Sequence, residues 1–598
     1  MVNQPSLSSS DLDSQPLLRS SSTPRNLKSS NRSVRASTTT TVLVSSTANI
    51  TISSPLPGND IPESSTHDHP ELTYTYAYGP TGLLGLRRNR YALGCALFAS
   101  IGGWVFGYDQ GVVANVLVMK AFLQRFPLDA WGKGMLTASL DLGALFGALM
   151  SGLADRYSRK TAIFWACVVF IVGTILQALA LSVFLLVLGR GLSGIGIGAL
   201  STLSPLYITE ISPPELRGSL LALEQFSIVL GCVAGFWVGY ATRNIDSSIS
   251  YVLPLSMPLL PALILAIGVF WLPPSPRLLV AQGKVEDAHE TLIRLRGEEN
   301  RTLADIEVLE IQAEASMLER RAYIEGGPGM SVKDNWLASE LRGWRLLLSK
   351  KYRDRTMVGI VVMFIQQWSG INALLYYGPT LLASFGLGSS NATLLVAGGV
   401  GIVQFLAVFP AIAGIDHWGR KFLLRSGSVV MGCSHLIIAM VVYEDSDDWA
   451  DHRVGAWLAV ACLYVFTLAY GVSYGPVGWV LPSEVFPTSI RSKGVALSTM
   501  SNWVNNFLIG LLAPVLIEMS PAWTFMIFSI ACFFGYLWST YIIPETASVS
   551  LEEIDRFFRS SVGKEDAELR SEIEGELGLV EVIRQIWEED RPERSGAD

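Results

Sequence analysis

Two short stretches decide the fold: Gly152-Leu-Ala-Asp155-Arg-Tyr-Ser-Arg-Lys160 and Asp416-His-Trp-Gly-Arg-Lys421 carry the same Asp-x-x-small-Arg-Lys pattern. A second pattern also occurs twice. Glu210-x-x-Pro213 is followed by an arginine seven residues after the glutamate, and Glu484-x-x-Pro487 is followed by an arginine at the same distance. Each copy follows an apolar run. Two unrelated signals at equivalent positions indicate an internal duplication, which is typical of secondary transporters that bind their solute between the repeats.

The composition indicates a membrane protein. Half of the 598 residues are hydrophobic and only 16% are charged, whereas a soluble protein carries about 25% charged residues. The net charge of −8 gives no electrostatic support for a nucleic-acid partner. The six cysteines lie inside apolar runs without metal-ligand spacing, which predicts neither a disulfide framework nor a metal site. No phosphate-binding loop of the Walker type is present, so ATP is not expected as the energy source. No constellation of cofactor-binding residues is present either, so no cofactor is expected.

Twelve apolar runs are long enough to cross about 30 Å of hydrocarbon as helices. They lie near 91–117, 134–153, 161–181, 184–208, 219–241, 254–272, 357–381, 392–415, 424–443, 454–481, 495–517 and 522–543. We therefore predict an all-α membrane protein with two six-helix halves, 89–272 and 353–545. The charged linker 273–352 has helical periodicity near Val285–Leu295 and Ala304–Ile324.

The two terminal segments are polar. Residues 1–88 are rich in Ser, Thr, Asn and Pro and are predicted to form a disordered tail, and 546–598 are expected to form a second tail. Alternate short loops hold nine Lys and Arg residues against five in the opposite set, which places both tails and the linker in the cytosol of a multi-pass cell-membrane protein. Asn391-Ala-Thr is a candidate glycosylation acceptor on an outer loop.

Further motifs resemble the sugar porter family of the major facilitator superfamily, of fungal type, over about Tyr91 to Asp555. They are Phe106-Gly-Tyr-Asp109, Arg190-x3-Gly194-x-Gly196, Pro273-Pro-Ser-Pro-Arg277, Gln366-Gln-Trp-Ser-Gly-Ile-Asn372-Ala-Leu-Leu-Tyr-Tyr377, Gly475-Pro-Val-Gly-Trp479 and Pro544-Glu-Thr546. The resemblance implies the twelve-helix major facilitator fold and alternating access to a monosaccharide site. The sequence departs from the family pattern at Ser158, Tyr251-Val252, Pro274, Gln404 and Ala547-Ser548.

A sugar site needs amides that donate and accept hydrogen bonds, together with a flat aromatic surface. Gln366, Gln367 and Asn372 supply the amides, and they share one face only if the helix is distorted, for which Gly370 provides the means. By resemblance, the site also includes Gln225, Trp479, Trp503 and Asn506, with Tyr376 and Tyr377 in an outer gate. The alternative is that these amides join helices without touching solute.

Asp109 is a carboxylate inside an apolar span, which marks a functional site by default, and Arg190 is its natural partner. By resemblance, the matching pair couples protons to transport in the bacterial xylose–proton symporter, whereas human glucose facilitators have Asn at the acidic position. Proton symport is therefore favoured. A permanent ion pair that holds two spans together is the alternative. Glu224 lies in another apolar span, either as a second titrating group or facing a neighbouring helix.

The charged motifs at the cytosolic helix ends are expected to act as a gate, by bridging the halves when the inner side is shut. Their members are Asp155, Arg156, Arg159, Glu210, Arg217, Asp416, Arg420, Glu484 and Arg491. The expected partners are a sugar, a proton and the lipid bilayer, with no obligate protein partner and no enzymatic activity. A facilitative carrier, a polyol or quinate transporter, and a transporter-like nutrient sensor remain as alternatives.

Overall fold

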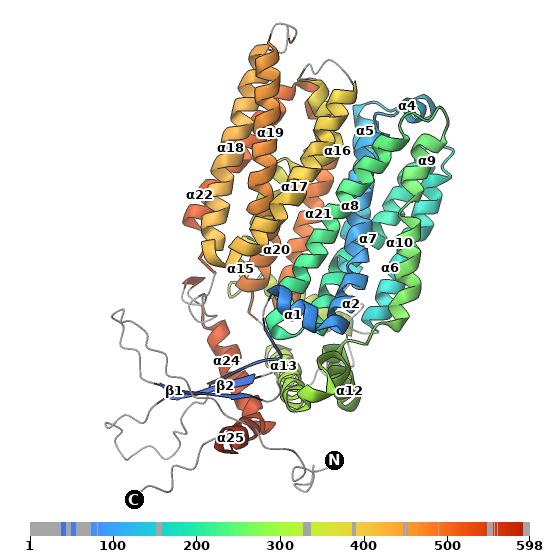
Figure 1. Ribbon diagram of the computed structural model, residues 1–598. Coiled ribbons are helices and arrows are strands. Elements are labelled where there is room, and N and C mark those ends of the chain that lie inside the picture. Colours follow the sequence, from blue (N-terminus) through green and yellow to red (C-terminus); the bar gives the residue numbers. More distant parts are fainter. Residues whose placement is uncertain are drawn as a thin grey trace, which may run out of the picture.

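The computed structural model describes residues 37–43, 49–55, 73–80, 82–150, 158–326, 336–385, 390–445, 449, 452–487, 489–546, 554, 557–558 and 560–589. Figure 1 shows a bundle of long helices with a smaller group of helices and strands at one end. We call that end, which carries α12 (Val285–Arg296), α13 (Arg301–Gly326) and α24 (Val562–Glu576), the tail side. The opposite end of the bundle is called the far side.

The bundle has two halves of six spans each. The N-terminal half contains α2 (Arg90–Ala99) with α3 (Ile101–Val116), α5 (Ala130–Met150), α6 (Arg159–Ala178), α7 (Val183–Ile211), α8 (Arg217–Thr242), and α9 (Ile249–Ser256) with α10 (Leu259–Gly268). The C-terminal half contains α15 (Arg353–Trp368) with α16 (Ile371–Ala383), α17 (Ser390–Trp418), α18 (Arg420–Asp445), α19 (Arg453–Val472) with α20 (Tyr474–Val485), α21 (Arg491–Met519) and α22 (Pro521–Tyr541). The shorter elements are α1 (Gly82–Arg88), α4 (Lys120–Arg125), α11 (Pro276–Ala281), α14 (Trp336–Leu347), α25 (Leu579–Glu589), η2 (Pro214–Leu216), η3 (Val269–Trp271) and η4 (Glu298–Asn300).

Within the described residues, 11 helical segments are long and apolar enough to cross a membrane. The twelfth span is α5, whose 21 residues include the charged Lys133 and Asp141. It packs between α7 of its own half and α21 of the other half. The predicted twelve-helix fold is therefore confirmed, and the span that stands out for its polarity lies at the interface of the halves.

Small residues let the helices approach closely. A Cβ atom added at Gly107 on α3 would lie 1.8 Å from the Ile228 carbonyl oxygen on α8, and one at Gly134 on α5 would lie 2.4 Å from the Leu511 carbonyl oxygen on α21. Helices in lipid gain no hydrophobic drive toward one another, so such close packing is a main source of their association. The contact at Gly134 brings the two halves together on the far side.

Two spans of the C-terminal half are broken near their middle. Gly370 separates α15 from α16 with φ +95°, a left-handed conformation that favours glycine, and a Cβ there would lie 2.7 Å from the Phe528 ring. His435 Nε2 bonds the Ser369 carbonyl oxygen at 2.9 Å at the same break. Ser473, with φ −110° and ψ −90°, separates α19 from α20. Non-helical backbone at this depth is tolerated because it is buried in protein.

The described parts of residues 1–88 differ from the predicted disorder. Strands β1 (Ser37–Leu43), β2 (Asn49–Pro55) and β3 (Thr73–Ala77) form an antiparallel sheet in the order β1-β2-β3. Runs of Thr, Val, Ile and Tyr favour strands, and the apolar surface that they lack is supplied by α13 and α25. Ile50 and Tyr78 pack there with Leu303, Ile306 and Ile583.

Buried polar contacts attach this sheet and the linker to the N-terminal half. Tyr78 Oη donates to Glu307 at 2.7 Å, and Arg296 Nη2 pairs with the same carboxylate at 2.7 Å. Burial opposes ionisation of Glu307, yet Arg296 and Tyr78 together hold the pKa of Glu307 below its usual value. Arg296 also donates to the carbonyl oxygens of Ile211 and Ser212 at the end of α7, at 2.8 and 3.1 Å.

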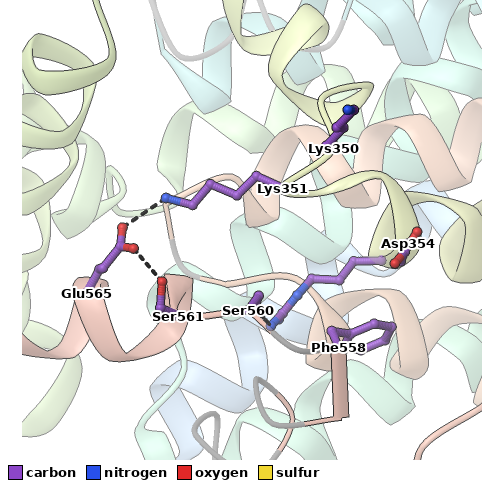
Figure 2. A pocket seen from close by; sticks show the side chains of 8 residues that line it. Lys350, Lys351, Asp354, Phe558, Ser560, Ser561 and Glu565 are labelled. Atoms are coloured by element: carbon purple, nitrogen blue, oxygen red, sulfur yellow. Dashed lines mark hydrogen bonds and ion pairs between the residues drawn. The ribbon is translucent and has the colours of Figure 1, made fainter.

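The C-terminal tail is attached to the other half. A cavity of about 370 Å³ lies between residues around the start of α15 and residues around the start of α24. Figure 2 shows the side chains that line it. Lys351 Nζ and Ser561 Oγ donate to Glu565 at 2.8 and 2.6 Å, and Arg321 of α13 adds a third hydrogen bond at 2.8 Å. These bonds lower the pKa of Glu565 to about 2. Arg355 of α15 also donates to Ser560 at 2.9 Å. The described parts of the linker and of both tails therefore contact one another and both halves on the tail side.

Candidate functional site

A chain of amides runs through the C-terminal half. Asn372 Nδ2 donates to Gln367 Oε1 across the break at Gly370, and also to Asn506 Oδ1 on α21 at 2.8 Å. All three side chains are buried. The distortion that the sequence requires for Gln367 and Asn372 to meet is therefore confirmed. We call Gln367, Asn372 and Asn506, together with the groups that they reach in the other half, the polar network.

Gln366 points elsewhere. Its Nε2 donates to the Tyr474 carbonyl oxygen at 2.8 Å, and its Oε1 accepts from Asn502 Nδ2 at 2.7 Å. A Cβ at Gly478 would lie 2.6 Å from the same Nε2, so that glycine leaves room for the amide. The side chain fastens α15 to the second helix break and to α21. In this conformation its hydrogen bonds correspond to those of an amide that joins helices.

The polar network continues into the N-terminal half through α5. Asn506 Nδ2 donates to Asp141 Oδ1 at 3.0 Å and to Tyr376 Oη at 3.1 Å. Tyr376 Oη in turn donates to Asp141 Oδ1 at 3.2 Å and accepts from Gln110 Nε2 of α3 at 3.3 Å. Hydrogen-bonded side chains of the two halves thus meet at one buried point.

The far side of this point is closed. Tyr377 Oη donates to the Gly510 carbonyl oxygen at 2.7 Å, and its ring lies nearly perpendicular to that of Tyr376 at a centroid distance of 6.3 Å. Both tyrosines are almost fully buried. Beyond them, Gly134 allows α5 to contact the backbone of α21. Tyr376 and Tyr377 therefore lie where the two halves meet on the far side.

Asp109 and Arg190 form a buried ion pair inside the N-terminal half. Arg190 Nη2 lies 3.4 Å from Asp109 Oδ2, and their side chains are 3% and 0% exposed. Arg190 Nε also donates to the Leu136 carbonyl oxygen on α5 at 3.1 Å. Asp109 Oδ1 has no hydrogen-bond partner among the described residues. One arginine of α7 thus contacts both α3 and α5, and α5 also carries Asp141.

Three residues that the resemblance assigns to the sugar site are not joined to the polar network by any hydrogen bond between described residues. Gln225 on α8 and Trp479 on α20 are half-buried. Trp503 is 1% exposed, with its ring 5.4 Å from that of Phe106 in an apolar cluster that also holds Leu140 and Ala144. Trp503 therefore packs against the N-terminal half in this conformation.

The repeated charged motifs pair with one another inside each half. Arg159 binds Glu210 at 2.8 Å, and Arg420 binds Glu484 at 2.7 Å. Thr546 Oγ1 also donates to Glu484 at 2.6 Å. The first motif thus supplies the arginine and the second motif the glutamate, in the same way in both halves.

Other members of the expected gate are placed as follows. Arg491 Nε donates to the Phe486 carbonyl oxygen at 3.3 Å, and Arg217 begins α8 close to the charges of Arg277, Glu307 and Glu314. Asp155, Arg156 and the side chains of Asp416 and Asn391 lie outside the described residues. Among the residues that the structure describes, no three His, Cys, Asp or Glu side chains gather as a metal site would require.

Sequence reasoning missed Asp141 and assigned no role to Gln110. The available signal for Asp141 was the one that singled out Asp109, a carboxylate within an apolar span. Glu224 faces a neighbouring helix, since its Oε1 lies 2.8 Å from where a Cβ of Gly103 on α3 would be. The buried acids of the N-terminal half therefore include Asp141 and Glu224 in addition to Asp109.

Comparison with known proteins agrees with this architecture. The model of the sugar (and other) transporter family matches residues 95–558. The chain belongs to this family. The match begins in α2 and includes every span up to the end of α22, so both halves and the polar network lie within it.

Individual relatives are similar over most of their length. The chain is 29% identical to the glucose transporter GlcP of Staphylococcus epidermidis, over 80% of this chain and 99% of that protein. It is 32% identical to the metabolite transport protein YwtG of Bacillus subtilis, which is named as putative, over 78% and 95%. It is 28% identical to the low-affinity glucose transporter HXT3 of Saccharomyces cerevisiae, over 78% and 82%.

Solved structures show the same fold. The proton:xylose symporter XylE bound to 6-bromo-6-deoxy-D-glucose superimposes with a TM-score of 0.64 and 26% identity, over 78% of this chain and 99% of that one. A partially occluded inward-open conformation of XylE from E. coli gives a TM-score of 0.64 and 25% identity, over 77% and 100%. The major facilitator fold and the family implied by the sequence motifs are thereby confirmed.

Proposed function

We propose that the protein takes up a monosaccharide together with a proton by alternating access across the cell membrane. The tail side faces the cytosol in this proposal, because the Lys and Arg bias of the short loops favours that orientation. The names of the relatives, glucose transporters and a proton:xylose symporter, support a hexose or pentose as the solute. The partners of the protein in this proposal are the sugar, the proton and the lipid bilayer.

The observation that carries the proposal is the polar network at the interface of the halves. Asn372 and Asn506 present amides from α16 and α21, and Asn506 reaches Asp141 of the other half at 3.0 Å. A sugar hydroxyl can replace any of these partners, because it both donates and accepts. Sugar that binds here interacts with both halves, and that is the requirement for coupling its binding to their relative motion.

Asp109 is assigned to the proton. A proton that enters from outside neutralises the carboxylate and breaks its ion pair with Arg190, which otherwise joins α3 to α7 at 3.4 Å. Arg190 keeps its bond to the Leu136 carbonyl oxygen, so its charge is still partly compensated. Return to the outward state requires that the proton leave to the cytosol and that the ion pair form again. Proton and sugar therefore move together.

A facilitative carrier is the second candidate. Arg190 is held by both Asp109 and the backbone of α5 and is 3% exposed, which also suits a permanent structural pair. Such a pair loses about 3–5 kcal/mol of stability when one partner is removed. In that case Asp109 contributes to folding and carries no proton.

Sugar uptake into transporter-deficient yeast distinguishes the two candidates. Labelled glucose and xylose are supplied at pH 5 to cells with wild-type protein or Asp109→Asn, with and without an uncoupler. Symport predicts accumulation by the wild type that the uncoupler abolishes, and exchange without accumulation by Asp109→Asn. If both proteins only equilibrate the sugar, the facilitator is correct. If neither sugar enters although the protein reaches the cell surface, the assigned substrate class is wrong.

A further inference from the structure

Asp141 is the buried acid that the proposed mechanism leaves unused. It lies in the middle of α5, is 0% exposed, and accepts hydrogen bonds from Asn506 and Tyr376 on a single oxygen, Oδ1. Its second oxygen, Oδ2, has no hydrogen-bond partner among the described residues. Gly510 leaves the space for this oxygen, since a Cβ there would lie 3.2 Å from Oδ2.

The charges around Asp141 leave it without a counterion. Asp109 of α3 and Arg190 of α7 both act on it electrostatically, but Arg190 is already paired with Asp109. From α16 it is faced by the phenols of Tyr376 and Tyr377, from α21 by the neutral Asn506, and Lys133 lies two turns away at the start of its own helix. The described residues supply no ion pair to Asp141. An ionised carboxylate in such a place is costly.

We propose that Asp141 is a positioning residue of the sugar site that also makes closure of the far side depend on a proton. In the closed state its Oδ1 fixes the amide of Asn506, so that Nδ2 points to α5 and Oδ1 points to Asn372. When α5 separates from α21 and α16, the carboxyl meets water and ionises. Closing again then requires that one proton from the far-side solution bind the carboxylate, on Oδ2.

This proton differs from the coupled one. It binds from the far side as the gate closes and returns to the far side as the gate opens, so Asp141 moves no net charge across the membrane. Asp109 retains the transported proton. Closure is therefore favoured at low far-side pH and weakened as that pH rises, whereas the number of protons per sugar stays the same. The inference rests on the proposed sugar transport.

The test is exchange of labelled sugar as a function of external pH, in cells that carry wild type, Asp141→Asn or Asp141→Ala. Ser139→Ala is the matched control, because the one hydrogen bond of that hydroxyl among the described residues stays within α5, to the Leu136 carbonyl oxygen. An asparagine still accepts from Asn506 and Tyr376 but cannot ionise. Asp141→Ser, which also cannot ionise, supplies the same pH test if the amide variant does not reach the membrane.

We expect wild type and Ser139→Ala to exchange sugar more slowly as external pH rises from 5 to 8. Asp141→Asn, combined with Asp109→Asn so that the coupled proton no longer contributes, should lose this dependence, whereas Asp109→Asn alone should keep it. Asp141→Asn alone should keep uncoupler-sensitive accumulation and raise KM less than Asp141→Ala does, because its amide oxygen still accepts from Asn506. Asp141→Ala should raise KM about tenfold, since two donors lose their shared acceptor. An unchanged pH profile in the double variant, or exchange without accumulation in Asp141→Asn alone, would overturn the gate role. An unchanged KM in Asp141→Ala would overturn the positioning role. Failure of the wild type to transport sugar would instead refute the proposed function.

Discussion

Replacing Asn506 by alanine is the perturbation that examines the polar network most closely. The change removes three hydrogen bonds, with Asn372 at 2.8 Å, Asp141 at 3.0 Å and Tyr376 at 3.1 Å. Asn372 keeps its hydrogen bond to Gln367, and Tyr376 keeps those with Asp141 and Gln110, so no partner is left wholly unsatisfied. At about 0.5–1.5 kcal/mol of net stability for each of the three bonds, the expected loss is about 1.5–4.5 kcal/mol.

The assay combines the melting temperature of the purified protein in detergent with its Kd for sugar. Asn506→Ala should lower the melting temperature. It should also raise the Kd for sugar by about tenfold or more, since 1.4 kcal/mol corresponds to a factor of ten. Asn505→Ala is the matched control on the next residue of α21. Asn505 bonds Trp368 at 3.0 Å and the Ser501 carbonyl oxygen at 2.7 Å, outside the network, so its loss should leave Kd unchanged.

A double-mutant cycle with Asn372→Ala isolates the shared bond. Because both single variants remove the contact between Asn372 and Asn506, the double variant should be more stable than the sum of the two losses by about 0.5–1.5 kcal/mol. Strict additivity, or an equal change of Kd in Asn505→Ala, would refute the reasoning that these amides act as one connected sugar site.

Two further predictions concern the helix break and the tail. Gly370→Ala places a Cβ atom on a residue with φ +95°, 2.7 Å from the Phe528 ring. The variant should lose at least about 1–2 kcal/mol of folding stability and should have a higher KM for sugar uptake. A KM and a melting temperature equal to those of the wild type would contradict this prediction. The hydrogen bonds from Lys351, Ser561 and Arg321 lower the pKa of Glu565 from an ordinary 4.5 to about 2. The stabilisation that the ionised Glu565 gives the tail is therefore fully present above pH 4.5. It is lost only as the pH falls from 4.5 toward 2. The rate of limited proteolysis of the C-terminal tail should then be the same at pH 5 and at pH 8. Glu565→Gln should raise this rate at both pH values. Release of the wild-type tail at pH 5 would show that other groups hold it.

The sequence contained enough to predict the architecture. Apolar runs of spanning length and the duplicated motifs predict two six-helix halves, and Gly370 marks the place where one span must distort. These predictions succeed because they depend on local properties, namely hydrophobic length, repeat spacing and the conformational freedom of glycine. The family motifs include Asp109 and Asn372, and the structure places both in buried polar contacts.

What the sequence could not provide was the pairing between distant helices. Asp141 has the same signature as Asp109, but nothing local shows that it meets Asn506 and Tyr376 across the interface of the halves. The charged repeats illustrate the same limit. Arg159 and Arg420 recur with Glu210 and Glu484 in the sequence, whereas the structure was needed to place each arginine against the glutamate of its own half.

The terminal segment 1–88 shows a limit of composition. Polar tails are expected to remain disordered because they cannot bury enough apolar surface by themselves. Here α13 and α25 supply that surface, and Ile50 and Tyr78 pack against it. Tyr74 and Tyr76 add hydrogen bonds to Glu310 of α13 at 2.8 and 2.7 Å. The described strands of this segment thus form a sheet because they pack against partners far away in the chain.

Proton movement during sugar entry tests the central claim most directly. The purified protein is placed in liposomes that contain a pH-sensitive dye, and an inward sugar gradient is applied with no initial pH gradient. The account predicts that sugar entry acidifies the interior through the wild type, and that Asp109→Asn exchanges labelled sugar without any acidification. Sugar entry through the wild type with no change of internal pH would contradict the account and identify the buried pair of Asp109 and Arg190 as structural.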